Sequence, residues 1–240
     1  MTQLQNPLAS QASEETKQAN FLICPPKAIF NKDAFHSIID ATLKTPGSVK
    51  ELRSALISEL IKYNKNGRER LKIEFQEQPL AAHRLNKSYT YLTDCILSCI
   101  WRIATQLIVF KSPTKNTERI SVIAVGGYGR GEMAPFSDVD LLFLSQNKFT
   151  SWAENVIECI LYMLWDLKLK VGHSSRTMQQ CMLLGREDFT IRTSMLELRH
   201  VAGDYSLSRE LESSLSTKLF LGTEQEFIDA KLRERDARHH

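Results

Sequence analysis

Two short apolar runs, at residues 120–125 and 139–144, lie close together and limit the folds open to this chain. The first is rich in β-branched residues and ends on Gly126-Gly127, and the second follows Asp138-Val139-Asp140. Runs of this kind are typical of buried strands. The interval between the glycine pair and Asp138 is too short for a full crossover helix. We therefore expect a helical turn and a loop before the second strand returns alongside the first.

Residues 32–110 show helical spacing instead. A first helix is predicted up to the break at Pro46-Gly47, and a second begins at Ser48, which forms a possible capping box with Glu51. We expect that second helix to break at residues 64–67. A third is predicted at 71–85, punctuated by Pro79, and a fourth at 89–110.

Beyond the second strand, the spacing predicts a helix at 152–165 and helices at 178–184 and 224–240. Between the first two, residues 167–171 alternate like a strand, and the strand-like segment extends to residue 177. The expected fold class is α/β in the α+β sense: a small mixed β-sheet core with helices, preceded by an all-helical N-terminal extension. We expect a flexible leader at 1–20, the helical extension at 21–116, the core at 117–222, and at 223–240 a helix leading to a missing C-terminal part.

Composition excludes several classes of function. With 42% apolar and 25% charged residues, the chain has the composition of an ordinary globular protein. Its basic and acidic residues nearly balance, and a net charge of +3 does not indicate a nucleic-acid binder. Five cysteines without a CxxC pair argue against a disulfide scaffold or a structural zinc site. The polar N-terminus lacks the apolar core of a signal peptide, and charges interrupt the apolar stretch at 89–110. We expect a cytoplasmic protein without membrane or nucleic-acid partners.

The residues around the two predicted strands point to phosphate chemistry. Asp138 and Asp140 are two positions apart, so on a strand both carboxylates face one side. Such a pair repels unless a cation lies between them, and hard oxygen ligands suit Mg²⁺. Two such ions would hold the attacking and leaving oxygens of a displacement at phosphorus. Gly126 and Gly127 allow backbone N–H groups to approach phosphate oxygens, and Arg130 could neutralise a polyphosphate.

Each part of this pattern has a common structural explanation. A Gly-Gly pair alone is usually a turn, and two aspartates at a strand end are often solvated. The glycines form no Walker loop, because no Gly-Lys-Ser/Thr follows, and a dinucleotide fingerprint would need a full crossover helix. The combination of strand, Gly-Gly, short interval and Asp-x-Asp strand is much more specific.

This combination resembles the nucleotidyltransferase superfamily that includes DNA polymerase beta. The fuller string GGYGRGEMAPFSDVDLLFL at 126–144 is similar to the family of uridylyltransferase/uridylyl-removing enzymes of the PII nitrogen-sensing system. Further matches are WDLKLKVGHSSRT at 165–177, TSMLELR at 193–199 with AGD at 202–204, and ERDARH at 234–239. The resemblance covers about residues 85–240. It implies a nucleotidyltransferase core at residues 117–222.

The resemblance implies transfer of UMP from UTP to a tyrosine hydroxyl of the PII protein, with release of pyrophosphate. Asp138 and Asp140 would hold Mg²⁺, and the residues contacting the nucleotide would be Gly126, Gly127, Arg130 and Ser137. The family continues with a hydrolytic HD domain and ligand-sensing domains that do not fit in this chain, so we expect no uridylyl-removing activity from it.

The superfamily also supplies a third carboxylate from a neighbouring strand. Glu197 is our choice for this role and Asp188 the alternative. Glu197 could equally be a surface helix carboxylate paired with Arg199 or His200. Three other functions stay open: an adenylyltransferase of glutamine synthetase, a small-molecule or tRNA nucleotidyltransferase, and a non-catalytic nucleotide-binding fragment.

Overall fold

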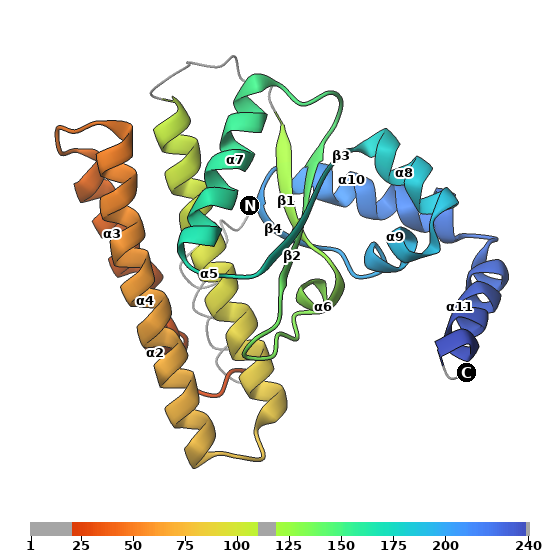
Figure 1. The fold of residues 1–240 in the computed structure, drawn as a ribbon, viewed down its shortest axis with the longest axis horizontal. Helices are drawn as coiled ribbons and strands as arrows, with labels where there is room; N and C mark the ends of the chain where they lie inside the picture. The colour runs from red at the N-terminus through yellow and green to blue at the C-terminus, as the bar shows by residue number, and fades with distance from the viewer. Residues whose placement is uncertain (1–20, 110–118, 239–240) are drawn as a thin grey trace, which may run out of the picture. The chain divides into compact units, whose positions relative to one another are not determined.

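The computed structural model describes residues 21–109 and 119–238, and the chain divides into two compact units (Figure 1). The first unit comprises Met1–Ile103 together with Gly131–Ser137, and the second comprises Ala104–Arg130 and Asp138–His240. The loop between the glycine pair and Asp138 therefore belongs with the helices. The domain limits expected from the sequence, including the leader at 1–20, which lies outside the described residues, stay a prediction.

The first unit is built from helices. They are α2 (Pro26–Ile29), α3 (Lys32–Leu43), α4 (Val49–Glu77) and α5 (Ala82–Val109), the last of which continues into the second unit. The expected capping box at the start of α4 is confirmed, because the Ser48 hydroxyl accepts from the Glu51 N–H and the Glu51 carboxylate accepts from the Ser48 N–H. The rings of Phe30, Phe35 and Tyr63 pack at centroid distances of 5.0–5.7 Å in the core of this unit.

The break expected at residues 64–67 is wrong, because α4 runs through them to Glu77. Gly67 is a site of close packing: a Cβ built there would lie 2.7 Å from the Ile29 carbonyl oxygen and 2.9 Å from Cδ1 of Leu92. The chain instead turns at 78–81, around Pro79, so the predicted helix at 71–85 is divided between α4 and α5.

The loop Gly131–Ser137 is anchored to two of these helices. The Arg68 guanidinium on α4 donates to the carbonyl oxygen of Pro135, and the Met133 N–H donates to the Thr90 hydroxyl on α5 at 3.2 Å. The loop is thus ordered by hydrogen bonds within the first unit.

A four-stranded mixed sheet forms the centre of the second unit, in the order β3-β2-β1-β4. The strands are β1 (Ile120–Ala124), β2 (Val139–Ser145), β3 (Val171–Thr177) and β4 (Arg199–Gly203). β1 pairs antiparallel with both β2 and β4, whereas β2 and β3 are parallel. This sheet, with the preceding helices, confirms the expected fold class.

The remaining elements of the second unit are helical: α6 (Gly126–Gly129), α7 (Ser151–Asp166), α8 (Met178–Glu187), α9 (Phe189–Ser194), α10 (Tyr205–Leu215), the π-helical turn η1 (Ser216–Phe220) and α11 (Glu224–Arg238). Figure 1 shows α7 on one side of the sheet and α8, α9 and α10 on the other. On that second side, Ile123, Leu142 and Leu144 of the sheet share a buried core with Leu207 and Leu211 of α10.

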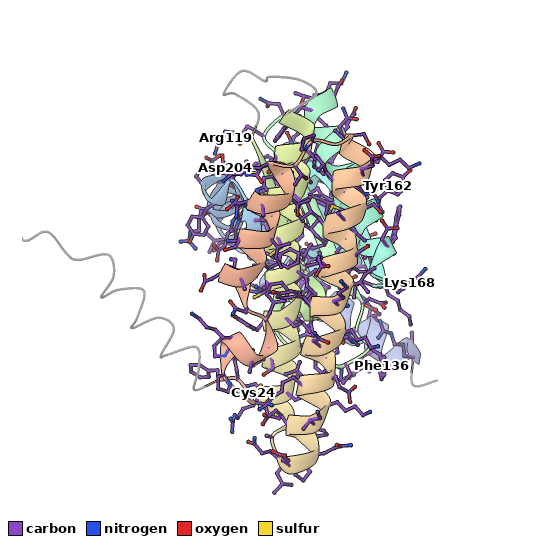
Figure 2. All side chains as sticks on the ribbon, turned by 90° about the vertical axis from the view of Figure 1, so that its left-hand side faces the viewer. Cys24, Arg119, Phe136, Tyr162, Lys168 and Asp204 are labelled. Atoms are coloured by element: carbon purple, nitrogen blue, oxygen red, sulfur yellow. The ribbon has the colours of Figure 1, made fainter. Side chains whose placement is uncertain are left out.

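The strand expected at residues 167–171 is wrong, because β3 begins only at Val171. Residues 167–169 finish α7 instead: the Leu167 and Leu169 N–H groups bond back to helix carbonyls, and Lys168 (labelled in Figure 2) has a left-handed φ of 58°. β3 occupies the second half of the strand-like segment 167–177, as an edge strand that carries exposed polar residues.

Two arginines, Arg119 and Arg192, connect segments of the second unit that are far apart in the sequence. Arg119, before β1, donates to the Asp204 carboxylate, which caps α10; Figure 2 labels both residues. The hydrogen bond from Arg119 holds the pKa of Asp204 well below its usual range. Arg192 of α9 is 3% exposed and donates to the Leu219 carbonyl at 3.0 Å, with its guanidinium 5.0–5.8 Å from the rings of Phe189, Phe220 and Phe227.

Among the helices in the described part of the chain, none combines the length and hydrophobicity that a membrane crossing requires.

Candidate active site

The glycine pair forms a tight turn at the end of β1. Val125 is extended, and its N–H donates to the Asp140 carbonyl at 3.1 Å, which continues the pairing of β1 with β2. Gly126 then adopts a left-handed φ of +58°, a conformation that favours glycine. Gly129 N–H bonds back to Val125 at 3.0 Å to close the single turn of α6. The first N–H groups of this turn lack an acceptor within the helix, as at every helix start.

Asp138 and Asp140 lie beside this turn. Asp138 immediately precedes β2 and is exposed, whereas Asp140 is the second residue of β2 and is half-buried. A Cβ built on Gly126 would lie 3.5 Å from Oδ2 of Asp140, so the carboxylate faces the glycine turn. Burial, and secondly the negative charge of Asp138, raise the pKa of Asp140. Both effects disfavour the ionised form of Asp140.

Arg130, which follows α6, forms an ion pair with Glu197, with 2.6 Å between Arg130 Nη1 and Glu197 Oε2. The Arg130 side chain is 50% exposed and the Glu197 side chain 38% exposed. Nη2 of Arg130 also lies 3.6 Å from where a Cβ on Gly127 would stand. The guanidinium is therefore held alongside the glycine pair while still accessible to solvent.

Glu197 lies between α9 and β4 rather than on a helix. A Cβ on Gly129 would overlap the Glu197 carbonyl oxygen, so the absence of a side chain at position 129 lets this segment lie against α6. Arg199, the first residue of β4, donates to the Tyr128 carbonyl at 3.2 Å and stacks 5.1 Å from the Tyr128 ring. These contacts fix α6 against the start of β4.

Two other predicted residues have local roles in the structure. The Ser137 hydroxyl accepts from the Ala134 N–H at 2.9 Å within the first unit. Asp188, the alternative third carboxylate, caps α9 by accepting from the Thr190 and Ile191 N–H groups, which lower its pKa. Its carboxylate is thus engaged by the backbone.

Asp138 and Asp140 fit Mg²⁺, since they are hard oxygen donors whose mutual repulsion a divalent cation would relieve. Across residues 21–109 and 119–238, no three His, Cys, Asp or Glu side chains gather closely enough to hold a metal by themselves. A cation at the pair would therefore take its other ligands from water and from substrate phosphates, as Mg²⁺ commonly does.

Sequence reasoning missed Gly172, which is paired with Asp140 across β2 and β3. The signal for it was a lone glycine inside a strand, which often marks the close approach of another group. Arg199 and its contact with Tyr128 had no sequence signal, because the pairing of β4 with β1 brings together segments far apart in the chain.

A strand, a glycine turn and an acidic pair entering the next strand thus lie together in this unit. Residues 108–180 match the family model described as "Nucleotidyltransferase domain", so the chain carries a nucleotidyltransferase domain.

Several curated proteins that are similar to this chain share one more specific name. The chain is 54% identical over 189 residues to the "Bifunctional uridylyltransferase/uridylyl-removing enzyme" of Ruegeria pomeroyi, an alignment covering 78% of this chain and 21% of that protein. Proteins of the same name from Cereibacter sphaeroides and Erythrobacter litoralis are 48% and 42% identical, over 91% and 81% of this chain and 24% and 20% of theirs. The resemblance inferred from the motifs is confirmed, and the chain spans between a fifth and a quarter of the length of these relatives.

Proposed function

We propose that this chain transfers UMP from UTP to a tyrosine hydroxyl of a PII signalling protein and releases pyrophosphate. The observation that carries the proposal is the Asp140 carboxylate facing the Gly126 turn, with the charge of Asp138 beside it. We choose UTP over other nucleotides as the donor because the similar proteins are named uridylyltransferases. In this reaction the phenolic oxygen, after losing its proton, forms a bond to the α-phosphorus as the bond to pyrophosphate breaks.

Each residue of the site has a role in that reaction. Asp138 and Asp140 would hold Mg²⁺, which in a two-metal arrangement neutralises the triphosphate and the developing charge at the attacking and leaving oxygens. Backbone N–H groups of Gly126 and Gly127 bind phosphate oxygens, and Arg130 adds a positive charge beside them. That Ser137 also contacts the nucleotide is implied by the family resemblance and stays a prediction.

The proposed third carboxylate is Glu197, and its pairing with Arg130 offers a second way for it to act. As a third carboxylate, Glu197 would contribute directly to turnover, but in the described residues its side chain does not gather with those of Asp138 and Asp140 into a three-residue metal site. As the partner of Arg130, it orients the guanidinium along the glycine pair. Glu197→Gln should cripple turnover with little loss of nucleotide binding in the first case. In the second case, Arg130→Gln and Glu197→Gln should have similar effects, and the double variant should be no worse than either.

A labelling assay tests the proposed function. The chain is incubated with a PII protein, Mg²⁺ and UTP radiolabelled at the α-phosphate, in competition with unlabelled ATP, CTP or GTP. We expect label on a PII tyrosine that an excess of unlabelled UTP lowers and that unlabelled ATP, CTP or GTP leaves nearly unchanged. Asp138→Asn and Asp140→Asn should abolish labelling. The matched control is Glu212→Gln, which removes an exposed carboxylate paired with Arg209 on α10 and should leave labelling intact.

Other outcomes would change the assignment. Labelling retained by both aspartate variants would place the chemistry elsewhere in the chain. Preferential use of ATP would indicate an adenylyltransferase. Nucleotide binding without any transfer would reduce the chain to a nucleotide-binding fragment.

A further inference from the structure

Gly172 lies directly across the sheet from Asp140. In the parallel pair β2/β3, Asp140 is the register partner of Gly172, and the adjacent Val139 N–H donates to the Lys170 carbonyl at 2.8 Å. Side chains of directly paired residues project from the same face of a sheet. A side chain at position 172 would therefore share the face on which the Asp140 carboxylate lies.

The Asp140 carboxylate already occupies that space. A Cβ built on Gly172 would lie less than 3.0 Å from Oδ1 of Asp140, a separation that Cβ atoms in proteins essentially never show, and 3.6 Å from Cγ of Asp140. The other oxygen, Oδ2, is 3.5 Å from the corresponding position at Gly126. The carboxylate thus lies between two glycines, with each oxygen turned toward one of them.

The backbone at position 172 does not itself require glycine. The described glycines with a left-handed φ are at positions 126, 131, 203 and 222, so an alanine at 172 would meet no backbone strain. The obstacle to a Cβ is the end of the Asp140 side chain, which can rotate away. The missing side chain at 172 therefore controls where a carboxylate points and not whether the strand forms.

We propose that Gly172 is a positioning residue for the metal ligand Asp140. Its missing Cβ lets the carboxylate lean toward β3 with Oδ2 facing the glycine turn. The inference rests on the proposed function, because it assumes that Asp140 holds a divalent cation. Residues that orient a metal ligand commonly change metal affinity by about 10- to 100-fold when altered.

The test is Mn²⁺ binding to the whole chain without nucleotide, followed by the loss of the electron paramagnetic resonance signal of free Mn²⁺. We expect Gly172→Ala to weaken Mn²⁺ binding by about 10-fold or more while the melting temperature in EDTA changes little. Asp140→Asn should weaken binding at least as much. Adding Gly172→Ala to Asp140→Asn should cause no further loss, because position 172 acts through that carboxylate.

Gly185→Ala is the matched control. A Cβ at Gly185 would approach Leu219 and Met195 side chains, each at 2.7 Å, so it demands a comparable adjustment of side-chain ends in the same unit. Those side chains belong to the apolar core and carry no metal ligand. This variant should bind Mn²⁺ as wild type does, whatever its melting temperature.

Each outcome separates the inference from the proposed function. If wild type binds Mn²⁺ through Asp140 but Gly172→Ala binds it equally well, the inference is overturned and the proposed function stands. If Gly172→Ala adds its full loss on top of Asp140→Asn, position 172 does not act through Asp140, and the inference again fails. If Asp140→Asn leaves Mn²⁺ binding unchanged, the proposed metal site is wrong and the inference is overturned with it.

Discussion

The electrostatic penalty on Asp140 predicts that Asp140→Asn stabilises the protein, while the proposed role of Asp140 in holding Mg²⁺ predicts that the same variant loses the proposed transfer. Two residues of extended chain place like charges about 7 Å apart, where they repel by ~0.6 kcal/mol in water and ~2.4 kcal/mol at an effective dielectric constant of about 20. Asp138 is exposed, so solvent screening moves the value toward the lower limit. We expect a gain of ~1 kcal/mol at neutral pH, equivalent to about 2–4 °C in melting temperature for a chain of this size.

The direction of the pKa shift fixes the pH dependence of this gain. Because the pKa of Asp140 is raised above its usual 3.8, the native state keeps its proton to higher pH than the unfolded state does. The penalty is therefore absent below the unfolded pKa and complete above the native one. The stability difference between Asp140→Asn and wild type should be largest near neutral pH and shrink as the pH falls toward about 4.

Thermal unfolding in EDTA, and then in Mg²⁺, measures both effects. Mg²⁺ at about 100 times its dissociation constant would stabilise wild type by ~2.7 kcal/mol and leave Asp140→Asn almost unchanged, so the order of stability should reverse. Glu212→Gln, which removes an exposed ion pair, serves as the control and should change stability by less than ~1 kcal/mol in either condition. The reasoning is refuted if Asp140→Asn is the less stable protein in EDTA, or if Mg²⁺ stabilises it as much as wild type.

Three further predictions concern stability and can be measured by urea denaturation. Ser48→Ala removes half of the capping box of α4 and should cost ~1 kcal/mol; no loss would show that the cap is dispensable. Gly67→Ala gains helix propensity of about 1 kcal/mol, but its Cβ meets the backbone carbonyl of Ile29, so a net loss of ~1 kcal/mol is expected and a net gain would contradict the packing. Arg119→Gln should lower the free energy of unfolding by ~1 kcal/mol at neutral pH, a value discounted for the partial exposure of the pair. The loss should shrink as the pH falls below about 4, because the lowered pKa of Asp204 contributes its full stability only above the pKa of Asp204 in the unfolded chain. A loss independent of pH would refute the ion pair as its cause.

The two glycine substitutions differ in what the new Cβ meets. At position 67 it meets a backbone carbonyl, which cannot move without shifting α2, so stability falls. At position 172 it meets the end of one side chain, so we expect metal binding to fall instead. Sequence alone does not separate these cases, since in both a single glycine interrupts a regular element.

Part of the candidate site was predictable because it is local in sequence. The interval from Gly126 to Asp140 contains a strand end, a turn and the start of the next strand, and the antiparallel pairing of β1 with β2 follows from that short connection. The ion pair of Arg130 with Glu197 was not predictable, because it depends on β4 pairing with β1 across more than sixty intervening residues. The same long-range pairing carries the contact of Arg199 with Tyr128.

The helices show the same division between local and long-range causes. Capping at Ser48 and the turn at Pro79 are local effects, which depend on hydrogen bonds and φ restrictions of neighbouring residues, and the sequence by itself determined them. The continuity of α4 through Gly67 was decided by tertiary packing, because burial against Ile29 and Leu92 outweighs the low helix propensity of glycine. Likewise, the sequence placed two acids and a glycine pair in one short segment, but only the sheet register set Gly172 beside Asp140, because a strand's partner is chosen by the fold and not by its own residues.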